Sequence, residues 1–534
     1  MKKQVLSLAV LLMGSSLICA QSNTSDVNSL GVGNLATVLQ VGSGNDSDID
    51  QDGAMNVLGG VGNWADVYQE GDDNSAVINQ RGDRNEAHAT QFGYGNYSNQ
   101  SQGVGWSEDN FQSLYQEGEM NTSYQLQRWD NNTGIVEQYG YDNYSSQDQR
   151  SLANGVDGNF GYVWQYGEGN SSNQVQRGQR NSAYAWQYGY GNMSDQFQEG
   201  NDNYAEVWQD GEMNANYQEQ YGNGNWAITW QFGYDNYSFQ GQYGNGNGSW
   251  TDQWGEDNSS EAYQTGDYNY QWTSQWGDDN SSLTNQEGES NYSGTMQWGY
   301  GNGSVTYQYG YANGSDTYQY GEMNGSGTLQ IGAWNGSTTY QDGYSNLSGT
   351  FQLGVGNGSY TEQIGYANLA GTAQIGMDNG STTLQHGDMN MSGTLQVGAY
   401  NSSMTHQDGY YNLSLTGQFG LGNYSNTYQY GEGNMSGTLQ VGAGNGSYTE
   451  QYGYANMAGT AQFGMDNGST TLQHGDMNMS GTLQIGSYNN AMTHQDGYSN
   501  LALTGQFGSS HYSNVYQNGV GNMSFVTQIG GSPF

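Results

Sequence analysis

Glutamine recurs every eleven residues along most of this chain, and this recurrence limits what the chain can fold into. From Gln165 to Gln528 the glutamine occurs without a miss. The unit is Gln-x-Gly-x-x-Asn-x-Ser/Ala-x-x-x, as in the stretch NGSGTLQIGAWNGSTTYQDG that starts at Asn324. A fixed period of this kind indicates a repeat architecture in which each unit packs against its neighbours.

The spacing within a unit predicts a β-strand followed by a tight turn. Asn335, Ser337, Thr339 and Gln341 stand two residues apart, so a strand would place all four side chains on one face, whereas a helix would scatter them. The glycine and the two variable residues that follow the strand are predicted to form the turn. The fold class is therefore predicted to be all-β.

Several columns of the repeat have a period of 22 rather than eleven. The residue after glutamine is apolar only in alternate units, as at Ile331 and Leu353, and residues 346–433 recur closely as residues 434–521, a shift of 88. The sequence therefore predicts a parallel two-sheet β-solenoid (β-helix) built from 11-residue strand-turn units, two per 22-residue coil, with roughly 22 coils in all.

Stacked coils would place identical amide side chains about 4.8 Å apart, where they can hydrogen-bond to one another along the axis. Such a ladder would satisfy polar groups that point inward. The predicted structural ladder comprises Gln330, Asn335, Gln341, Asn346, Gln352, Gln363, Asn368 and Gln374.

Composition excludes an ordinary apolar core and several classes of function. The chain has 534 residues, 34% of them hydrophobic, with 86 Gly, one Pro, one Cys and a formal charge of -42. Such values are typical of disorder, so order must come from the repeat itself. A chain this acidic lacks the basic surface that binds nucleic acid.

The N-terminus has the features of a secretory signal peptide. Lys2 and Lys3 precede an apolar run from Val5 to Met13, and Ala20 is a small residue at the expected cleavage position. We expect a signal peptide at residues 1–20, a short segment at 21–30, the repeat solenoid at 31–530 and a C-terminal tail at 531–534. Cleavage would leave a charge of about -44 on the mature chain.

The repeat unit of this chain resembles that of a known family. The unit resembles the curlin repeat, Ser-x5-Gln-x-Gly-x-x-Asn-x-Ala-x-x-x-Gln, which QVGSGNDSDIDQ (Gln40–Gln51) and QIGYANLAGTAQ (Gln363–Gln374) fit closely. The curlin ladder positions correspond here to Gln363, Asn368, Ala370 and Gln374. The apolar inner position of curlin is often Thr or Gln in this chain, as at Thr339.

The resemblance implies a secreted functional amyloid that self-assembles into fibres. It further implies export through a curli-type outer-membrane secretion pore, nucleator and chaperone proteins as partners, and a place in the biofilm matrix on the surface of a Gram-negative bacterium, where the fibres serve adhesion. The alternative is a long surface-attached β-solenoid that binds extracellular polysaccharide or another cell. Ice binding by the Thr rows is a weaker alternative.

Two outward surfaces are candidates for contact with partners. An aromatic column, which suits either sugar rings and bundling partners or stacking on itself, comprises Trp164, Trp186, Trp208 and Trp230. An uncharged strip on alternate strands of the C-terminal half is predicted to form a lateral interface that comprises Leu329, Ile331, Phe351, Leu353, Leu395, Val397, Leu439 and Val441. In the alternative register this strip would be the core.

No motif supports catalysis, a cofactor or a metal. Four of the six histidines are two pairs created by the 88-residue duplication. The acidic glycine-rich stretches GDDN and GMDNG lack the nine-residue period of calcium-binding β-rolls. We therefore expect a protein that is not an enzyme and has no cofactor.

Overall fold

The computed structural model describes residues 22–53, 62–152 and 157–530. Its regular elements are forty-five β-strands, and no helix occurs in these ranges, which confirms the all-β prediction. The predicted signal peptide at residues 1–20 and the tail at 531–534 lie outside the described residues. The segment 21–30, which the sequence analysis set before the repeats, contains the first strand.

The chain divides into two compact units, Met1–Ser171 and Ser172–Phe534. The strands of the first unit are β1 (Thr24–Leu30), β2 (Leu35–Val41), β3 (Asp46–Asp52), β4 (Trp64–Asp72), β5 (Ser75–Asp83), β6 (Glu86–Tyr94), β7 (Tyr97–Glu108), β8 (Phe111–Glu119), β9 (Thr122–Arg128), β10 (Thr133–Tyr141), β11 (Tyr144–Arg150) and β12 (Phe160–Glu168). Strand β13 (Ser171–Gln179) begins at the last residue of this unit.

The strands of the second unit have nearly uniform length. They are β14 (Ser182–Tyr190), β15 (Met193–Asn201), β16 (Tyr204–Glu212), β17 (Ala215–Tyr221), β18 (Trp226–Tyr234), β19 (Tyr237–Tyr243), β20 (Gly248–Glu256), β21 (Ser259–Asp267), β22 (Tyr270–Asp278), β23 (Ser281–Glu289), β24 (Tyr292–Tyr300), β25 (Gly303–Tyr311), β26 (Gly314–Glu322), β27 (Gly325–Ala333), β28 (Gly336–Tyr344), β29 (Leu347–Val355) and β30 (Gly358–Tyr366). They continue as β31 (Leu369–Met377), β32 (Gly380–Asp388), β33 (Met391–Ala399), β34 (Ser402–Tyr410), β35 (Leu413–Leu421), β36 (Tyr424–Glu432), β37 (Met435–Ala443), β38 (Gly446–Tyr454), β39 (Met457–Met465), β40 (Gly468–Asp476), β41 (Met479–Ser487), β42 (Asn490–Tyr498), β43 (Leu501–Ser509), β44 (Tyr512–Val520) and β45 (Met523–Gly530).

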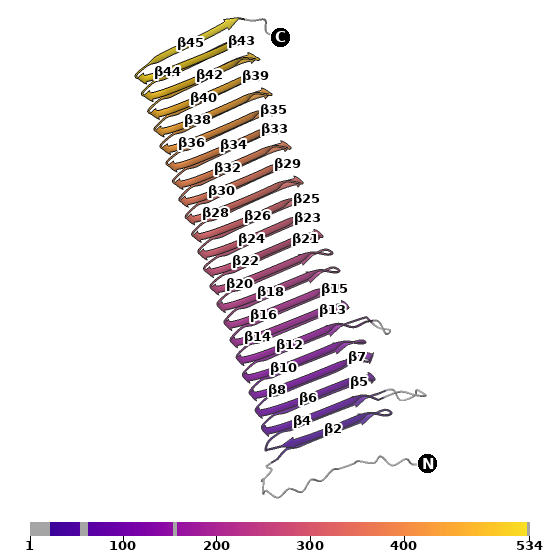
Figure 1. The fold of residues 1–534 in the computed structure, drawn as a ribbon. Helices are drawn as coiled ribbons and strands as arrows, with labels where there is room; N and C mark the ends of the chain where they lie inside the picture. Colours follow the sequence, from indigo (N-terminus) through magenta and orange to yellow (C-terminus); the bar gives the residue numbers. More distant parts are fainter. Residues whose placement is uncertain (1–21, 54–61, 153–156, 531–534) are drawn as a thin grey trace, which may run out of the picture. The chain divides into compact units, whose positions relative to one another are not determined.

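Within each unit, odd-numbered strands pair with odd-numbered strands and even-numbered strands with even-numbered strands, always in parallel (Figure 1). In the second unit, β27 pairs with β29 so that Gln330 lies beside Gln352, and β28 pairs with β30 so that Gln341 lies beside Gln363. Equivalent residues are thus 22 apart. This register confirms a two-sheet parallel β-solenoid with two strand-turn units per coil.

Each corner between the two sheets is shorter than the sequence predicted. Strand β28 continues through Gly343, and only Ser345 and Asn346 separate it from β29. Gly343 has a φ of 123°, and a Cβ at this position would lie 2.1 Å from the carbonyl oxygen of Gly365 in the next coil. The recurring glycine is therefore required by both its backbone conformation and the close approach of the neighbouring backbone.

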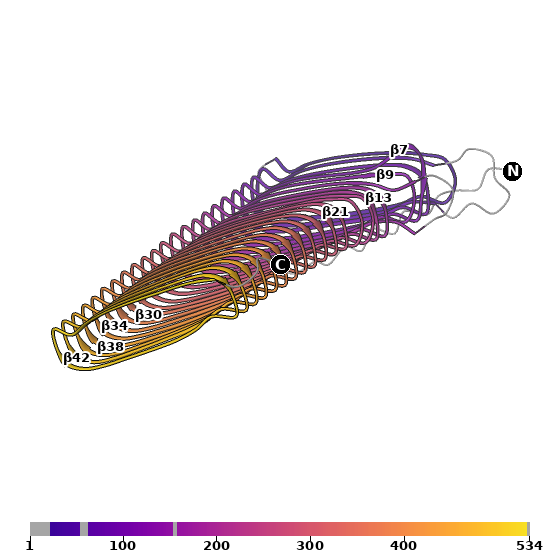
Figure 2. The same ribbon diagram turned by 90° about the horizontal axis from the view of Figure 1, so that it is seen from above.

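The residue before the corner asparagine also has a left-handed backbone. Ser345 has a φ of 56°, and its N–H donates to the carbonyl oxygen of Glu322 in the preceding coil at 2.9 Å. Seen from above, the coils of the second unit are flat loops with one strand on either side (Figure 2). The tight corners thus bring the inward faces of the two strands together.

The interior changes in character along the chain. In the first unit the buried inner positions include Ala65, Val67 and Ile78. In the second unit the same positions are mostly Ser, Thr or Gln, such as Ser326 and Thr328, which are 7% and 3% exposed, with Ala or Val at a minority of them. Polar side chains therefore fill most of the interior of the second unit and depend on hydrogen bonds within it.

Candidate assembly surfaces

The inner glutamines form a continuous hydrogen-bonded column. Gln352 is fully buried, and its Nε2 donates to Oε1 of Gln374 at 2.8 Å. The same Nε2 lies 2.8 Å from the carbonyl oxygen of Gly336 on the opposite sheet and 3.0 Å from that of Asn357. One amide therefore connects a coil to the next coil, to its own opposite strand and to its own corner.

The inner asparagines form a second column whose hydrogen bonds run in the opposite direction. Nδ2 of Asn357 donates to Oδ1 of Asn335, in the preceding coil, at 3.0 Å, and its backbone N–H donates to the same oxygen at 3.2 Å. Nδ2 also donates to the carbonyl oxygen of Gly376 at 3.1 Å. Between equivalent side chains, glutamine thus donates to the glutamine of the C-terminal coil and asparagine to the asparagine of the N-terminal coil.

The eight residues of the predicted ladder occupy these two kinds of column. Each is at most 1% exposed: Gln330, Asn335, Gln341, Asn346, Gln352, Gln363, Asn368 and Gln374. Between these columns the hydroxyl groups are less completely bonded, and Oγ of Ser326 and Oγ1 of Thr328 have no hydrogen-bond partner. The amide columns at the two ends of each strand therefore supply most of the specific polar contacts between coils.

The outward side of odd-numbered strands β27–β43 carries four columns of residues without a single charge; we call it the apolar face. The first column follows the asparagine and includes Leu347, the second is mostly glycine, the third includes Phe351, and the fourth includes Leu353. A groove of about 1430 Å³ runs over this face. The face lies opposite the buried Ser-Thr-Gln side of the same strands, so the alternative register, with this strip as the core, is not observed.

All eight residues of the predicted lateral interface belong to the third and fourth columns of the apolar face. They are Leu329, Ile331, Phe351, Leu353, Leu395, Val397, Leu439 and Val441. Leu353, Leu395 and Leu439 are each 38% exposed. The sequence analysis missed the first column, in which Leu347 is 54% and Met391 45% exposed, although its 22-residue spacing was visible.

The outer side of the even-numbered strands in the same coils is acidic instead. Its outward residues include Asp316, Asp342, Glu362, Asp408, Glu450 and Asp496. Burial raises the pKa of Asp316, whose Oδ1 has no hydrogen-bond partner. In the coils from β27 to β43 the two sheets therefore present surfaces that differ in charge.

The predicted aromatic column points outward on even-numbered strands. Trp164 lies on β12 in the first unit, whereas Trp186, Trp208 and Trp230 lie on β14, β16 and β18 in the second. The ring centroids of Trp186 and Trp208 are 6.2 Å apart, and Trp208 is 46% exposed. Trp186 and Trp208 thus form part of a surface row of aromatic rings in the second unit, with planes tilted by 37°.

A second run of aromatic rings, which the sequence analysis missed, follows one position after the glutamine. The centroids of Phe232 and Trp254 are 4.1 Å apart, those of Trp254 and Trp276 5.2 Å, and those of Trp276 and Trp298 5.8 Å. The first two pairs are stacked with interplanar angles of 23° and 20°. These rings cover one another's faces, which leaves mainly their edges for a sugar and favours the alternative of an aromatic ladder that stacks on itself.

Corner acids accept backbone hydrogen bonds from the preceding coil. Oδ1 of Asp388 accepts from the N–H of Tyr366 at 3.1 Å, and Oδ1 of Asp476 accepts from the N–H of Tyr454 at 3.0 Å. Acids alternate with tyrosines in this column. The carboxylates of Asp388 and Asp476 therefore connect adjacent coils.

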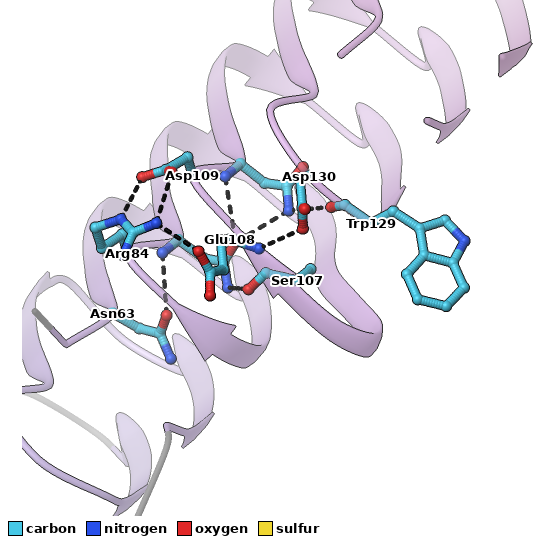
Figure 3. A network of polar contacts seen from close by, with 9 residues as sticks. Asn63, Arg84, Ser107, Glu108, Asp109, Trp129 and Asp130 are labelled. Carbon is cyan, nitrogen blue, oxygen red and sulfur yellow. Dashed lines mark hydrogen bonds and ion pairs between the residues drawn. The ribbon is translucent and has the colours of Figure 1, made fainter. Parts of the chain in front are cut away.

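An ionic network joins three coils of the first unit at their corners (Figure 3). Nε of Arg84 donates to Oδ1 of Asp109 at 2.6 Å, and Nη2 donates to Oε2 of Glu108 at 2.6 Å. The backbone N–H of Glu108 donates to Oδ1 of Asp130 at 2.9 Å. Hydrogen bonds to Asp109 and Glu108 raise the pKa of Arg84, so the guanidinium offsets repulsion between these acids.

No group of three or more His, Cys, Asp or Glu side chains in the described ranges is arranged to hold a metal ion. His386 lies 3.1 Å from Oε1 of Glu362 on the acidic sheet. Burial lowers the pKa of His406, and the nearby His386 adds to this effect. The described histidine pairs are thus part of the surface stacking on the even-numbered strands.

The fold and these columns define a class of protein: a parallel β-solenoid repeat protein stabilised by inner amide ladders. The family model for the curlin associated repeat matches residues 22–53, 59–82 and 71–102, so these residues are curlin associated repeats. The resemblance to the curlin repeat is confirmed there. No curated protein matches the chain.

The matched region lies within the more apolar part of the interior, which continues beyond it at Leu114, Val136 and Val163. Val67, Ile78 and Ala89 occupy the third inner position there and are buried, as in the curlin unit, whereas Thr or Gln takes this position in most later coils. Within the described ranges, no segment forms a helix of the length and apolar character needed to cross a membrane.

Proposed function

We propose that this protein is a secreted structural protein that self-assembles into curli-like fibres in the extracellular biofilm matrix of a Gram-negative bacterium, where the fibres serve adhesion. The observation that carries the proposal is the completion of each coil's inner amides by the next coil, as between Gln352 and Gln374 at 2.8 Å. Any coil is thus a template for another coil of the same design.

The terminal strands of the described solenoid support growth along the axis. In the described residues, β44 and β45 pair only with β42 and β43, on one side. Nε2 of Gln528 donates to the carbonyl oxygen of Tyr512 at 2.8 Å, while its Oε1 accepts from Gln506 at 2.7 Å. Unpaired strand edges of this kind are templates for a further chain.

The high negative charge fits a chain that is exported before it folds. A formal charge of -42 keeps an unfolded chain soluble through self-repulsion. By analogy with curlin proteins, the proposed partners are a curli-type secretion pore and nucleator or chaperone proteins. The curlin repeat and the β-solenoid fold are features of a structural protein rather than an enzyme.

Seeded growth tests the proposal. The purified chain without residues 1–20 is incubated and followed by Thioflavin T fluorescence and electron microscopy, with and without fragments of preformed fibres. We expect fibres and a lag phase that the fragments abolish, because strand edges template addition. Soluble monomers that persist for days, with or without fragments, would contradict the proposal.

The alternative function is a surface binding module that grips polysaccharide. Trp298, which is 58% exposed at one end of the stacked tryptophans, is the observation that favours it. Persistent monomers that bind polysaccharide, with binding lost in Trp298→Ala, would support this alternative over fibre assembly.

A further inference from the structure

We propose that two copies of this chain pair through the apolar face, with their solenoid axes parallel and a two-fold axis running along them between the two faces. The inference rests on the proposed function only in that such pairs would be the building blocks of the fibres. Pairing itself needs no fibre, so it can be measured on the soluble chain.

Charge directs the two copies to this face. The chain carries a formal charge of -42, so two copies repel one another at most approaches. In the coils from β27 to β43, the outward side of the even-numbered strands bears acids such as Asp342 and Glu450, whereas the apolar face bears none. Contact between two apolar faces therefore removes apolar surface from water without bringing carboxylates together.

The two central columns of the apolar face are complementary to each other. In each of the nine strands, one of the two central outward positions is glycine and the other carries a side chain. Seven strands place glycine first: Gly327 and Leu329, Gly349 and Phe351, Gly371 and Ala373, Gly393 and Leu395, Gly437 and Leu439, Gly459 and Ala461, Gly481 and Leu483. Two strands reverse the order: Leu415 and Gly417 on β35, and Leu503 and Gly505 on β43.

A two-fold axis parallel to the solenoid matches these columns. Rotation about it reverses the order of the four columns but keeps each coil level with the same coil of the partner. The second column then faces the third, so Gly437 lies opposite the partner's Leu439. On β35, where the order is reversed, Leu415 lies opposite the partner's Gly417. Every side chain of the two central columns therefore meets a glycine, including in the two exceptional strands.

The antiparallel arrangement lacks this match. A two-fold axis along the strands would place the second column over the second column, with glycine opposite glycine over most of the face. Such contacts leave voids, and voids forfeit dispersion contacts. The paired reversal at Leu415 and Gly417 is also unexplained in that arrangement, because the two positions would not face each other.

The outer columns and the area are consistent with a stable pair. In the parallel arrangement the first column, with Leu347 and Met391, faces the fourth, with Leu353 and Val397. Nine strands about 4.8 Å apart and about 20 Å wide cover roughly 900 Å² in each copy. The pair would bury about 1,800 Å² in total, which lies within the range of stable protein interfaces.

Exchange of one glycine and one leucine tests the arrangement. A Cβ at Gly437 meets no atom within 4 Å in the single solenoid, so Gly437→Leu should fold. In the pair its side chain would collide with the partner's Leu439, and we expect at least ten-fold weaker pairing. The double variant Gly437→Leu/Leu439→Gly copies the order found on β35 and should restore pairing.

The matched control is Gly446→Leu on β38, where a Cβ also meets no atom within 4 Å but the residue lies on the acidic sheet. Pairing is measured by sedimentation velocity of the freshly prepared soluble chain, with circular dichroism to verify the β-structure. We expect twice the chain mass for the native protein, the control and the double variant, and the monomer mass for Gly437→Leu.

A native chain that stays monomeric at all concentrations would overturn the pairing proposal, and so would unchanged or tighter pairing of Gly437→Leu or failure of the double variant to restore it. If Gly437→Leu loses β-structure, Gly349→Phe with and without Phe351→Gly provides a second exchange with the same expectations. Pairing without later fibre growth would contradict the proposed function but not this inference.

Discussion

Gln352 donates from Nε2 to Oε1 of Gln374 at 2.8 Å, and the two residues lie directly beside each other in strands β29 and β31. Asn357 donates in the opposite direction, to Oδ1 of Asn335 at 3.0 Å. Two amide columns of opposite polarity therefore run through the second unit. This arrangement satisfies the amides that the sequence places inside a chain with few apolar residues.

Removal of one glutamine should weaken the solenoid locally. Gln374→Ala removes one of the three acceptors of Gln352 Nε2 and the donor to Oε1 of Gln396, and a buried amide oxygen left without its partner costs about 1–3 kcal/mol. We expect faster hydrogen exchange in β29–β33 but an intact fold, since stability in repeat proteins is roughly a sum over neighbours. Hydrogen exchange with mass spectrometry measures this.

The triple variant of Gln352, Gln374 and Gln396 to Ala should open a protease-sensitive gap in the same region. Thr382→Ala, an outward substitution on β32, is the control and should leave exchange and proteolysis unchanged. Unaltered protease resistance in the triple variant would show that the amide column contributes little.

Two glycines of one strand should respond oppositely to the same substitution. Gly376 has a φ of 130°, and a Cβ there would lie 1.8 Å from the carbonyl oxygen of Gly398, whereas a Cβ at Gly371 meets nothing within 4 Å. Gly376→Ala should destabilise its coil by about 2–3 kcal/mol through strain and collision. Gly371→Ala should be neutral or slightly stabilising. Limited proteolysis at increasing temperature distinguishes the two, and equal effects would contradict the corner geometry.

A half-buried carboxylate should make stability depend on pH. Burial raises the pKa of Asp316 above its usual value of 3.8, so the folded state binds its proton more tightly than the unfolded state. The stabilisation from this group is therefore complete below pH 3.8 and is lost as the pH rises through the raised pKa. Asp316→Asn should remove this dependence and raise the melting temperature of the solenoid at pH 7.

The pH dependence of Asp316→Asn is measured by thermal unfolding between pH 3 and pH 8. Asp342→Asn removes the same charge from the next coil of the same sheet and serves as the control for net charge. Equal stabilisation by the two variants would assign the effect to net charge rather than to burial.

Assembly should accelerate when the negative charge is screened or neutralised. The chain carries a formal charge of -42 and has a sequence pI of about 4.1. Salt shortens the range of repulsion between carboxylates, so the lag time in Thioflavin T assays should fall from low to moderate salt, and again as the pH approaches the pI. A lag time that depends on neither the salt concentration nor the pH would contradict the proposed role of charge repulsion.

The sequence predicts the coil because strand geometry converts spacing into faces. Residues two apart share a face, so the positions of Gln341 and Asn346 sufficed to predict inward columns. The 22-residue coil followed from the apolar residue after alternate glutamines, as at Ile331 and Leu353. The spacing of residues in the sequence does not indicate the direction in which an amide donates its hydrogen bond. The opposite directions of the Gln and Asn columns could therefore be seen only in the structure. The short corner at Ser345 and Asn346 was missed because its left-handed residue varies between coils, from glycine at Gly356 to Asp378 and Tyr400, and therefore gives little sequence signal.

The outer surfaces were predicted less completely than the interior. The column that contains Trp208 was found, but the run from Trp254 to Trp298 was not, because it lies one position after the glutamine rather than one before. On the apolar face the column with Leu347 and Met391 was also missed, although its positions are Leu or Met in every strand from β29 to β43. Outward positions tolerate more residue types, so their patterns are weaker.

X-ray diffraction from aligned fibres of the chain without residues 1–20 tests the central claim most directly. If coils of successive molecules stack as coils do within one molecule, the strands lie perpendicular to the fibre axis and the pattern contains a meridional reflection at about 4.7–4.8 Å. A chain that forms no fibres, or fibres without a meridional reflection at that spacing, would contradict the account.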